Sequence, residues 1–237
     1  MGGAAIFGAS GGIGEALCIS LQGRGHAPIR AGSRQGEKPA GKDFVRFAFD
    51  LRDEESIAAA AETMADDPPD IVIVATGVLT LPDGTAPERT MRQIDAEALA
   101  EAIYLNTIGP ALIAKHVLPL FRRDRRHVFA AISAKVGSIE DNRIGGWHSY
   151  RASKAALNML MKNFAIELGR THPEVVVAAL HPGTVASALS APFQANLPAG
   201  QLTAPDKAAS NLLNVIDGLT PKDSGGLFAW DGKQLPY

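Results

Sequence analysis

The chain of 237 residues is within the range of one α/β domain, and its hydrophobic content of 46% excludes a mainly disordered protein. With 23 basic and 25 acidic side chains the formal net charge is −2, which gives no electrostatic footprint for nucleic acid or an anionic membrane. The single cysteine, Cys18, cannot form an internal disulfide, and together with the lack of a long apolar run it predicts a cytoplasmic protein that does not bind membranes.

Short apolar runs alternate with helical patterns along the whole chain. The predicted strands are residues 4–7, 27–31, 45–49, 71–75, 128–132, 175–180 and 227–230. The predicted helices are one that begins near Ile13, then residues 54–64, 96–121 with a break near Pro110, 150–168 and 205–216. Several strands are apolar on both faces, which is typical of a parallel sheet covered by helices on both sides. The alternation predicts a Rossmann-like, doubly wound α/β fold of about seven strands, in a single domain over residues 1–237.

A proline inside a predicted strand and two long predicted loops depart from this regular alternation. Pro28 lies inside the second predicted strand, although proline cannot donate a hydrogen bond to a strand ladder. Residues 32–43 and 183–203 form long loops, and long loops in a compact domain are usually functional or mobile. We expect the loop of residues 183–203 to shape a substrate pocket, with Pro192 and Phe193 making part of it apolar.

A glycine-rich turn joins the first strand to the first helix. Gly8-Ala9-Ser10-Gly11-Gly12-Ile13-Gly14 has the spacing G-x-x-x-G-x-G, close to the usual dinucleotide fingerprint. Glycines let the backbone approach a pyrophosphate, and the helix N-terminus offers it unpaired N–H groups and a partial positive charge. The motif therefore predicts nucleotide binding by Gly8, Ser10, Gly12, Ile13 and Gly14. The alternative is a plain strand-to-helix turn of small residues.

The residues after the second strand bear on which nucleotide binds. An acid at this place holds a ribose hydroxyl of NAD, whereas a nearby arginine accepts the 2′-phosphate of NADP. The stretch reads Arg30-Ala31-Gly32-Ser33-Arg34, and the nearest acid is Glu37. Ser33 can donate to a phosphate oxygen, and Arg34 can make a forked, charge-assisted contact. We therefore predict NADP rather than NAD, unless Arg30 and Arg34 are only solvated loop charges.

Tyr150 and Lys154 lie at i and i+4, one helical turn apart. A free tyrosine has a pKa of about 10, too high for ready proton exchange at neutral pH. An ammonium about 4 Å away, at an effective dielectric of about 20, is worth roughly 4 kcal/mol, which would lower the phenol pKa by at most about three units. Such a tyrosine would protonate a carbonyl oxygen during reduction or take a proton from an alcohol during oxidation. The spacing also occurs by chance, so its weight comes from its combination with the glycine turn.

Taken together, these features resemble the short-chain dehydrogenase/reductase family, in its C-factor-like and carbonyl-reductase-like branch, over essentially the whole chain. The family's glycine motif, helix asparagine, Tyr-x-x-x-Lys pair and Pro-Gly motif all have counterparts. The matching residues are Gly8, Gly12, Gly14, Asn106, Tyr150, Lys154, Pro182 and Gly183, with Ser187 at a usual threonine position and Asp50-Leu51 at the pair beside the adenine. Phe7 stands where a threonine is usual, and the family's Asn-Asn-Ala-Gly segment keeps only Gly77.

The resemblance implies a role for each matching residue. Tyr150 would be the general acid/base, Lys154 would lower its pKa and hold the nicotinamide ribose, and Asn106 would anchor a proton-relay water. A serine after the fifth strand would bind the substrate oxygen. The second serine of the family's Ser-Ser pair is usually the catalytic one, but only the first, Ser133, is present, so we expect it to serve with a one-residue shift and Ser138 is the alternative. The other residues expected to contact the cofactor are Ser33, Arg34, Asp50, Leu51, Gly77, Pro182, Gly183, Val185 and Ser187.

The function implied by the resemblance is an NADP-dependent oxidoreductase that transfers a hydride between nicotinamide and a small-molecule carbonyl or alcohol. The scattered histidines give no metal-site spacing, and helix pairing in the family motivates an expected homodimer or homotetramer. One alternative is an isomerase or dehydratase, because fold does not fix function. Another is a catalytically weak NADP-binding regulatory or signalling protein. The altered serine and Asn-Asn motifs support that alternative, and the intact Asn106, Tyr150 and Lys154 oppose it.

Overall fold

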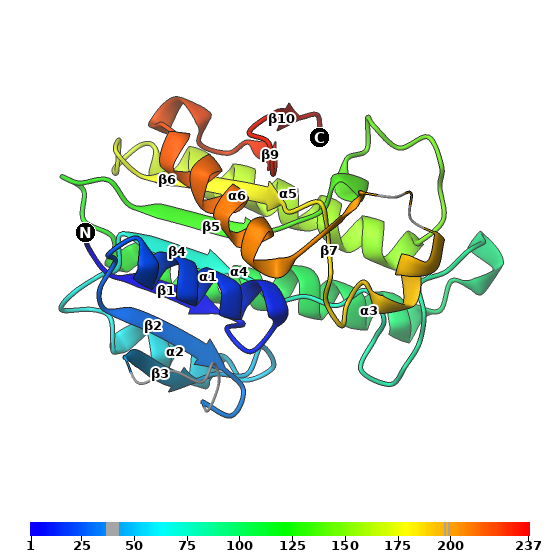
Figure 1. The fold of residues 1–237 in the computed structure, drawn as a ribbon, viewed down its shortest axis with the longest axis horizontal. Coiled ribbons are helices and arrows are strands. Elements are labelled where there is room, and N and C mark those ends of the chain that lie inside the picture. The colour runs from blue at the N-terminus through cyan, green and yellow to red at the C-terminus, as the bar shows by residue number, and fades with distance from the viewer. Residues whose placement is uncertain (37–42, 197, 199) are drawn as a thin grey trace.

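A sheet of eight strands forms the centre of the computed structural model, which describes residues 1–36, 43–196, 198 and 200–237 (Figure 1). The strands are β1 (Ala4–Phe7), β2 (Ile29–Ser33), β3 (Phe44–Ala48), β4 (Ile71–Val74), β5 (Val128–Ile132), β6 (Val176–His181), β9 (Leu227–Ala229) and β10 (Gln234–Leu235). Their order is β10-β9-β6-β5-β4-β1-β2-β3, and every neighbouring pair is parallel except β9 and β10. The predicted Rossmann-like, doubly wound fold is confirmed, and the strand beyond the expected seven is the short β10.

Helices cover both faces of this sheet. They are α1 (Gly12–Gly23), α2 (Glu54–Glu62), α3 (Ala96–Ile103), α4 (Gly109–Val117), α5 (His148–Leu168) and α6 (Pro205–Gly218). On one face α1 and α6 pack side by side, and on the other lie α2, α4 and α5 (Figure 1). The shorter α3 leads into α4 and packs against α5.

Alternate side chains of each central strand pack into two separate cores. In β1, Ile6 packs with residues of α1 and α6, whereas Phe7 packs with residues of α2, α4 and α5. In β4, Ile73 joins the core of Ile6, and Val74 joins the core of Phe7. Side chains of a strand alternate between the two faces of a sheet, and here both faces are covered. This is why the central strands are apolar at every position.

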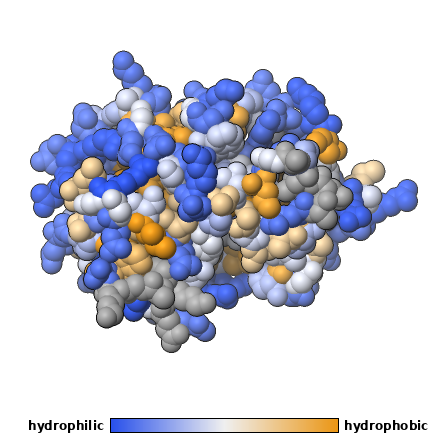
Figure 2. All heavy atoms as spheres, viewed as in Figure 1, coloured by the Kyte–Doolittle hydropathy of each residue, from blue (hydrophilic) through white to orange (hydrophobic). Residues whose placement is uncertain are grey.

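The outer surface of the helices is different in character. Where α1 and α6 face the viewer, the molecular surface is mostly hydrophilic, with apolar side chains in small separate patches (Figure 2). The inner sides of the two helices supply Leu17, Leu21, Leu212 and Leu213 to the core. This is the amphipathic pattern of helices that cover a sheet. In the described part of the chain, no helix combines the length and the apolar character that crossing a membrane requires.

Some element boundaries differ from the prediction for local physical reasons. Strand β2 begins at Ile29, just after Pro28, whose carbonyl accepts a hydrogen bond from the Ala4 N–H at 2.9 Å. Proline has no N–H to give to the ladder, so the strand starts beyond it. The helix expected over residues 96–121 is divided into α3 and α4 by a π-helical turn, Tyr104–Ile108. Pro110 lies in the first turn of α4, where its missing N–H is tolerated.

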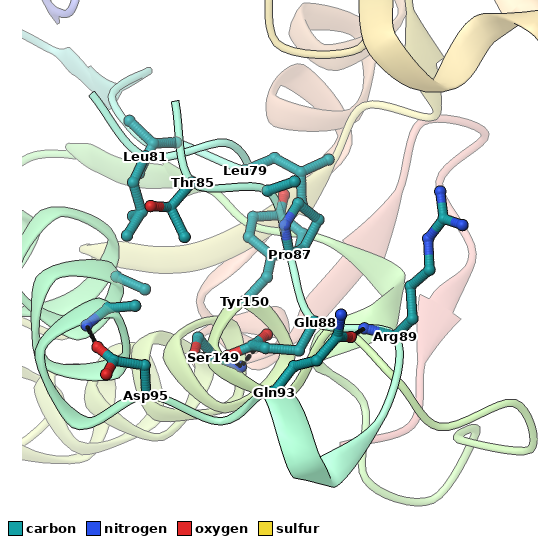
Figure 3. Close-up of a pocket in the computed structure, with 14 residues that line it drawn as sticks. Leu79, Leu81, Thr85, Pro87, Glu88, Arg89, Gln93, Asp95, Ser149 and Tyr150 are labelled. Carbon is teal, nitrogen blue, oxygen red and sulfur yellow. Dashed lines mark hydrogen bonds between the residues drawn. The ribbon is translucent and has the colours of Figure 1, made fainter. Parts of the chain in front are cut away.

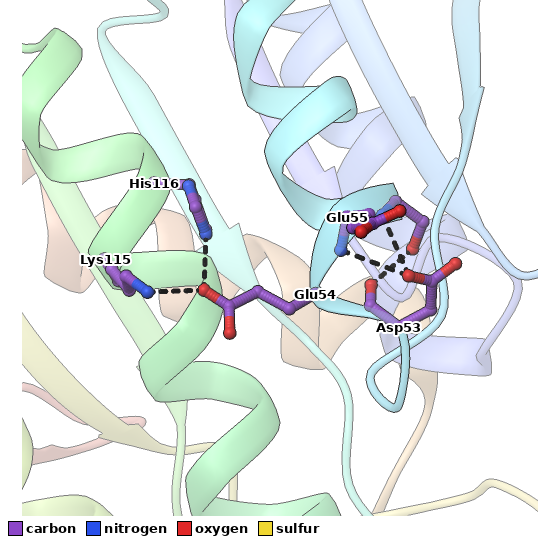
Figure 4. Close-up of polar contacts among 6 residues, drawn as sticks. Asp53, Glu54, Glu55, Lys115 and His116 are labelled. Atoms are coloured by element: carbon purple, nitrogen blue, oxygen red, sulfur yellow. Dashed lines mark hydrogen bonds and ion pairs between the residues drawn. The ribbon is translucent and has the colours of Figure 1, made fainter.

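The start of α2 is capped and tied to α4 (Figure 4). The Asp53 carboxylate accepts a hydrogen bond from the Glu55 N–H at 3.1 Å. Glu54 accepts hydrogen bonds from Lys115 at 2.5 Å and His116 at 2.9 Å, and these bonds lower the pKa of the Glu54 carboxyl. Carboxylates also suit the positive end of a helix dipole. The cluster joins the start of α2 to α4 at the exposed surface, where ion pairs add little stability.

The carboxyl ends of the strands mark the place where a ligand is expected. The chain sets β2 and β3 on one side of β1 and then places β4 on the other side. In doubly wound sheets, ligands bind in the crevice outside the strand carboxyl ends at such a switch point. The segments that follow β1, β4, β5 and β6 all leave the sheet at this edge, on the right in Figure 1.

Candidate active site

The glycine-rich turn between β1 and α1 is closely packed. Gly8 has a φ of +96°, a conformation that residues with side chains rarely adopt. A Cβ on Gly14 would overlap the carbonyl oxygen of Gly8, so the first turn of α1 lies directly against the strand end. The first N–H groups of an α-helix have no intrahelical acceptor, which gives this turn the backbone required of an anion site. Ser10 is exposed, and Ile13 is half-buried in the wall of the larger pocket described below.

Two residues at the end of β2, Ser33 and Arg34, carry a hydroxyl and a guanidinium next to each other in the chain. Ser33 is buried, and its Oγ has no hydrogen-bond partner among the described residues. A buried hydroxyl without a partner is costly, so a ligand oxygen that reached it would satisfy it. Arg34 follows at the exposed surface, whereas Arg30 is buried and pairs with Asp67 at 3.1 Å. Arg30 is therefore structural, which leaves Ser33 and Arg34 as phosphate-binding candidates. Glu37 lies outside the described residues.

The remaining residues predicted to contact a cofactor fall into two groups. Asp50 and Leu51 follow β3, where the half-buried Asp50 carboxylate accepts the Arg52 N–H at 2.9 Å and Leu51 packs against Gly109. Neither of them lines the larger pocket. The members of the second group all do line it, and they are Gly77, Pro182, Gly183, Val185 and Ser187. The structure therefore gathers the second group around one pocket and places the first just after β3.

Asn106 is fully buried and ties separate segments together. Its Oδ1 accepts the Val78 N–H at 2.8 Å, and its Nδ2 donates to the Val78 carbonyl at 2.9 Å and to Ser153 Oγ at 3.0 Å. The residue lies in the π-helical turn between α3 and α4, and such turns are frequent at functional sites. Asn106 thus fixes the segment after β4 against α5.

Tyr150 and Lys154 lie in the first turns of α5, and both are buried. The Lys154 ammonium donates to the Ile132 carbonyl at 2.9 Å and lies 5.9 Å from the centre of the Tyr150 ring. Gly77 completes this corner, because a Cβ there would be 2.9 Å from Asn106 Oδ1 and 3.2 Å from Lys154 Nζ. The structure therefore brings these predicted site residues together at one end of α5.

The predicted lowering of the Tyr150 pKa is wrong for this structure. Burial raises the pKa of Tyr150 to about 12 and lowers the pKa of Lys154 to about 8. Both shifts have one cause, since removing a group from water disfavours its charged form. The spacing of Tyr150 and Lys154 predicts the attraction between phenolate and ammonium, whereas the desolvation arises only from the folded structure. Tyr150 is therefore protonated at neutral pH, and the pKa of Lys154 lies close to physiological pH.

The serine candidates differ in where they point. Ser133 lines the larger pocket, and its hydroxyl donates to Asn158 Oδ1 at 2.6 Å. Ser138 is also buried, but it accepts a backbone N–H of the following loop at 3.1 Å and does not line that pocket. Ala134, the neighbour of Ser133, packs against Tyr150 in the pocket wall. Ser133 and Ala134 both line the pocket, but the one that packs against Tyr150 is the alanine, which has no hydroxyl to offer there.

The larger pocket has a volume of about 550 Å³ at the carboxyl edge of the sheet. Trp147 packs in its wall between Tyr150 and Phe193, with ring centres 6.2 and 5.2 Å away. The loop predicted over residues 183–203 also contains two short strands, β7 (Thr184–Val185) and β8 (Leu202–Thr203), and a 3-10 helix, Ala191–Asn196. Phe193 and Pro192 lie in that helix, and they line the pocket together with Leu189. The loop therefore forms an apolar part of the pocket, as its composition predicts.

Some polar residues of this pocket were not predicted. Thr76 Oγ1 and His181 Nδ1 are buried and have no hydrogen-bond partner among the described residues. Burial lowers the pKa of His181 to about 4, so the imidazole is neutral at physiological pH. His181 ends the apolar strand β6, and Thr76 lies two residues beyond the end of the apolar strand β4. A polar residue at the carboxyl end of an apolar strand is the signal in the sequence that could have identified both. Within the described residues, no group of three or more His, Cys, Asp and Glu side chains is placed to hold a metal ion.

Tyr150 also borders a smaller pocket of about 280 Å³ (Figure 3). Its wall includes Glu88, whose buried carboxylate accepts the backbone N–H of Ser149 at 3.1 Å and also the Ser149 hydroxyl. The Glu88 carbonyl accepts the Trp147 N–H at 2.5 Å. Burial alone would raise the pKa of Glu88, but the hydrogen bonds from Ser149 lower it. Glu88 therefore caps the start of α5, next to Tyr150.

Replacing Glu88 with alanine is expected to lower the free energy of unfolding by about 1 to 2 kcal/mol, because the N-terminus of α5 loses its cap. Urea denaturation measures this loss. Glu97→Ala is the matched control, since Glu97 is exposed in the first turn of α3 and Asp95 already caps that helix. Equal stabilities of the two variants would contradict the capping role.

Three comparisons relate this chain to known proteins. The family model described as short chain dehydrogenase matches residues 3–198. The chain is 31% identical over 235 residues to a 1-hydroxy-2-glutathionyl-2-methyl-3-butene dehydrogenase from Rhodococcus sp. (strain AD45), with 98% of each chain covered. It is 33% identical over 180 residues to the C-signal of Myxococcus xanthus, which covers 76% of this chain and 99% of that protein.

Solved structures share the fold. The carbonyl reductase Sniffer of D. melanogaster gives a TM-score of 0.85 at 21% identity, with 100% of each chain covered. The NADPH-bound carbonyl reductase from chicken fatty liver gives a TM-score of 0.83 at 25% identity, with 99% of this chain and 98% of that chain covered. The sheet described above is therefore the sheet of these reductases.

Proposed function

The chain belongs to the short-chain dehydrogenase family, and from this membership we propose that it is an NADP-dependent oxidoreductase acting on a carbonyl or alcohol, with Tyr150 as general acid/base. One observation carries the proposal: Tyr150 and Lys154 share the wall of a pocket that reaches the glycine turn at Ile13. A proton donor and a cofactor-binding turn thus open onto the same space. The direct test is oxidation of NADPH by the purified protein in the presence of a panel of aldehydes and ketones.

The residues around the pocket fit a nicotinamide cofactor. Ser33 Oγ and Thr76 Oγ1 are buried hydroxyls without partners among the described residues. Ser33 ends β2, Thr76 follows β4, and the glycine turn follows β1, which lies between these two strands in the sheet. When bound, the cofactor gives or accepts a hydride at its nicotinamide ring. We assign the pyrophosphate to the glycine turn, the 2′-phosphate to Ser33 and Arg34, the adenine side to Asp50 and Leu51, and the nicotinamide ribose to Lys154.

Tyr150 handles the proton of the reaction at its phenolic oxygen. With a pKa of about 12 it is protonated at neutral pH, which suits donation to a carbonyl oxygen during reduction. The charge of Lys154 would stabilise the phenolate that remains after donation. Its hydrogen bond to the Ile132 carbonyl already fixes its position, so little reorganisation is needed. We propose that Asn106, which is locked by three hydrogen bonds, anchors the water that returns the proton.

Arg34→Ala is expected to weaken NADPH binding by about 10- to 100-fold and to leave NADH binding unchanged. The reason is that a charge-assisted hydrogen bond is worth about 1.5 to 3 kcal/mol, and tenfold in affinity corresponds to about 1.4 kcal/mol. Fluorescence titration with each reduced cofactor measures both constants, so NADH is the internal control. Tighter binding of NADH than NADPH by the unmodified protein would overturn the choice of NADP.

Ser133→Ala is expected to lower kcat/KM by about tenfold or more, since it removes one hydrogen bond to the substrate oxygen. The Asn158 Nδ2 is buried without a partner among the described residues. If the Asn158 amide turns over, that nitrogen donates to Ser133 Oγ and frees the serine proton for the substrate. Ser138→Ala is the matched control and is expected to keep its kcat/KM. The reverse result would assign the role to Ser138.

A catalytically weak, NADP-binding regulatory or signalling protein is the second candidate. Two observations favour it: Ala134 takes the place of a hydroxyl beside Tyr150, and one relative is named C-signal. Tight NADPH binding with no turnover across the carbonyl panel would support this candidate. A reaction that leaves the absorbance of reduced nicotinamide unchanged would instead indicate an isomerase or dehydratase.

Several expectations from the sequence stay predictions. They are the single domain over residues 1–237, the cytoplasmic location and the assembly into a homodimer or homotetramer. Sedimentation of the purified protein would measure the last of these.

A further inference from the structure

The charged side chains that line the larger pocket are all positive. Among the described residues that line it, none is aspartate or glutamate, whereas Arg89, Lys135 and Lys154 are cationic. Lys154 donates a hydrogen bond to the Ile132 carbonyl, and we have already assigned it to the nicotinamide ribose and to the Tyr150 phenolate. Arg89 and Lys135 are therefore positive charges in the pocket wall for which the proposed function has no use.

These charges come from segments on the substrate side of the pocket. Lys135 directly follows Ala134, which packs against Tyr150, and Arg89 directly follows Glu88, which caps α5. The proposed cofactor contacts at the glycine turn and Arg34 instead follow β1 and β2. The charges thus lie with the apolar wall of Trp147 rather than with the site for the cofactor phosphates.

Both side chains are available to a ligand. Figure 3 shows the Arg89 side chain extending away from Glu88 and Gln93, and no hydrogen bond of its guanidinium is found within the described residues. The Lys135 ammonium lies 3.3 Å from the Asp141 carboxylate, with both side chains about half exposed. Exposed ion pairs of this kind are worth little and exchange readily.

The field of Lys135 also reaches the pocket interior. Burial is the main cause of the lowered pKa of His181, and the positive charge of Lys135 lowers it further. His181 lines the same pocket. The Lys135 ammonium is therefore felt inside the pocket as well as in solvent.

We propose that the substrate is an anion: a carbonyl or alcohol compound with an apolar body and a carboxylate at its far end, held by Arg89 and Lys135. This assignment rests on the proposed function for the reacting carbon and adds the part of the substrate that does not react. The apolar body packs on Trp147, Leu189 and Phe193 while its reacting oxygen meets Tyr150. Arginine suits this task because its planar fork matches a carboxylate.

The test uses two probes, para-acetylbenzoate and its methyl ester, which share the reacting ketone and the aromatic ring and differ in the negative charge and one methyl group. The unmodified enzyme is expected to reduce the acid with a kcat/KM about tenfold or more above that of the ester, because a charge-assisted contact is worth about 1.5 to 3 kcal/mol. The double variant Arg89→Gln/Lys135→Gln is expected to lose this preference while keeping its kcat/KM for the ester and its KM for NADPH. Arg92→Gln is the matched control, since Arg92 is exposed nearby but does not line the pocket.

A binding arm separates this proposal from the proposed function. Calorimetry in the presence of NADP⁺ measures affinity for the two probes without turnover. Tighter binding of the acid, lost in the double variant, supports the anion site even if neither probe is reduced. Equal binding of acid and ester, a preference that survives the double substitution, or a raised KM for NADPH in the double variant would overturn it. The last result would assign the two cations to the cofactor.

Discussion

Replacement of Tyr150 by phenylalanine should lower kcat for carbonyl reduction by about a hundred- to ten-thousandfold, the usual contribution of a positioned acid or base. The substitution removes a single oxygen and leaves the ring in its place between Trp147 and Lys154. Because Tyr150 is buried and its pKa is raised to about 12, it carries its proton throughout the neutral range. The lost rate is therefore the lost donation of that proton, measured by steady-state kinetics on a confirmed substrate.

The matched control is the same substitution at Tyr104. Tyr104 begins the π-helical turn, and the Arg52 guanidinium lies 5.3 Å from its ring centre, outside the larger pocket. Tyr104→Phe is expected to keep kcat, and both variants are expected to bind NADPH as the unmodified protein does. Full activity of Tyr150→Phe would show that another group donates the proton.

The pH dependence of kcat/KM tests the proposed interaction between Lys154 and Tyr150. Lys154 has a pKa lowered to about 8, so its charge is present below that pH and is lost as the pH rises through it. Since the charge stabilises the phenolate left by donation, reductive kcat/KM should be level below about pH 8 and fall above it. Tyr150→Phe, which leaves no phenolate, should lack this fall.

The elements that carry strong local patterns were predictable. The glycine turn, the apolar central strands and the spacing of Tyr150 and Lys154 are each fixed within a few residues of sequence, and the doubly wound fold follows from their alternation. Strand β10 has two residues and no pattern of its own, so only its pairing with β9 defines it.

The missed features depend on three-dimensional packing. Arg89 and Glu88 come from a long segment without periodicity, and only the fold brings them to Tyr150. The hydrogen bond from Ser133 to Asn158 joins the end of β5 to α5, and only the fold brings these two residues together. The pKa of Tyr150 depends on burial, and burial belongs to the folded chain rather than to an i, i+4 pair.

Replacement of Gly14 by alanine should strongly weaken cofactor binding and also lower the stability of the fold. A Cβ at this position would overlap the Gly8 carbonyl oxygen and come within 2.9 Å of the Gly8 carbonyl carbon. Both are backbone atoms of a packed turn, so no side chain can move aside to relieve the contact. We expect a loss of about 3 kcal/mol in the free energy of unfolding, within the range for overpacked sites, and a fall in Tm of about 6 to 12 °C.

The same overlap should move α1 away from β1 and spoil the backbone N–H groups proposed to hold the pyrophosphate. Losing two charge-assisted hydrogen bonds, each worth about 1.5 to 3 kcal/mol, would weaken NADPH binding by about a hundredfold or more. Titration with NADPH and thermal unfolding without cofactor measure the two effects separately.

Gly11→Ala distinguishes this steric argument from a general intolerance of side chains in the turn. Gly11 has a φ of −81°, which any residue adopts, and a Cβ there would lie 3.6 Å from the Gly8 carbonyl oxygen, an ordinary contact. We expect Gly11→Ala to keep both its Tm and its NADPH affinity. If both alanine variants lose affinity equally while keeping their Tm, the cofactor itself must lie against Gly11 and Gly14. If Gly14→Ala changes neither quantity, the turn does not need the close approach of α1 to β1.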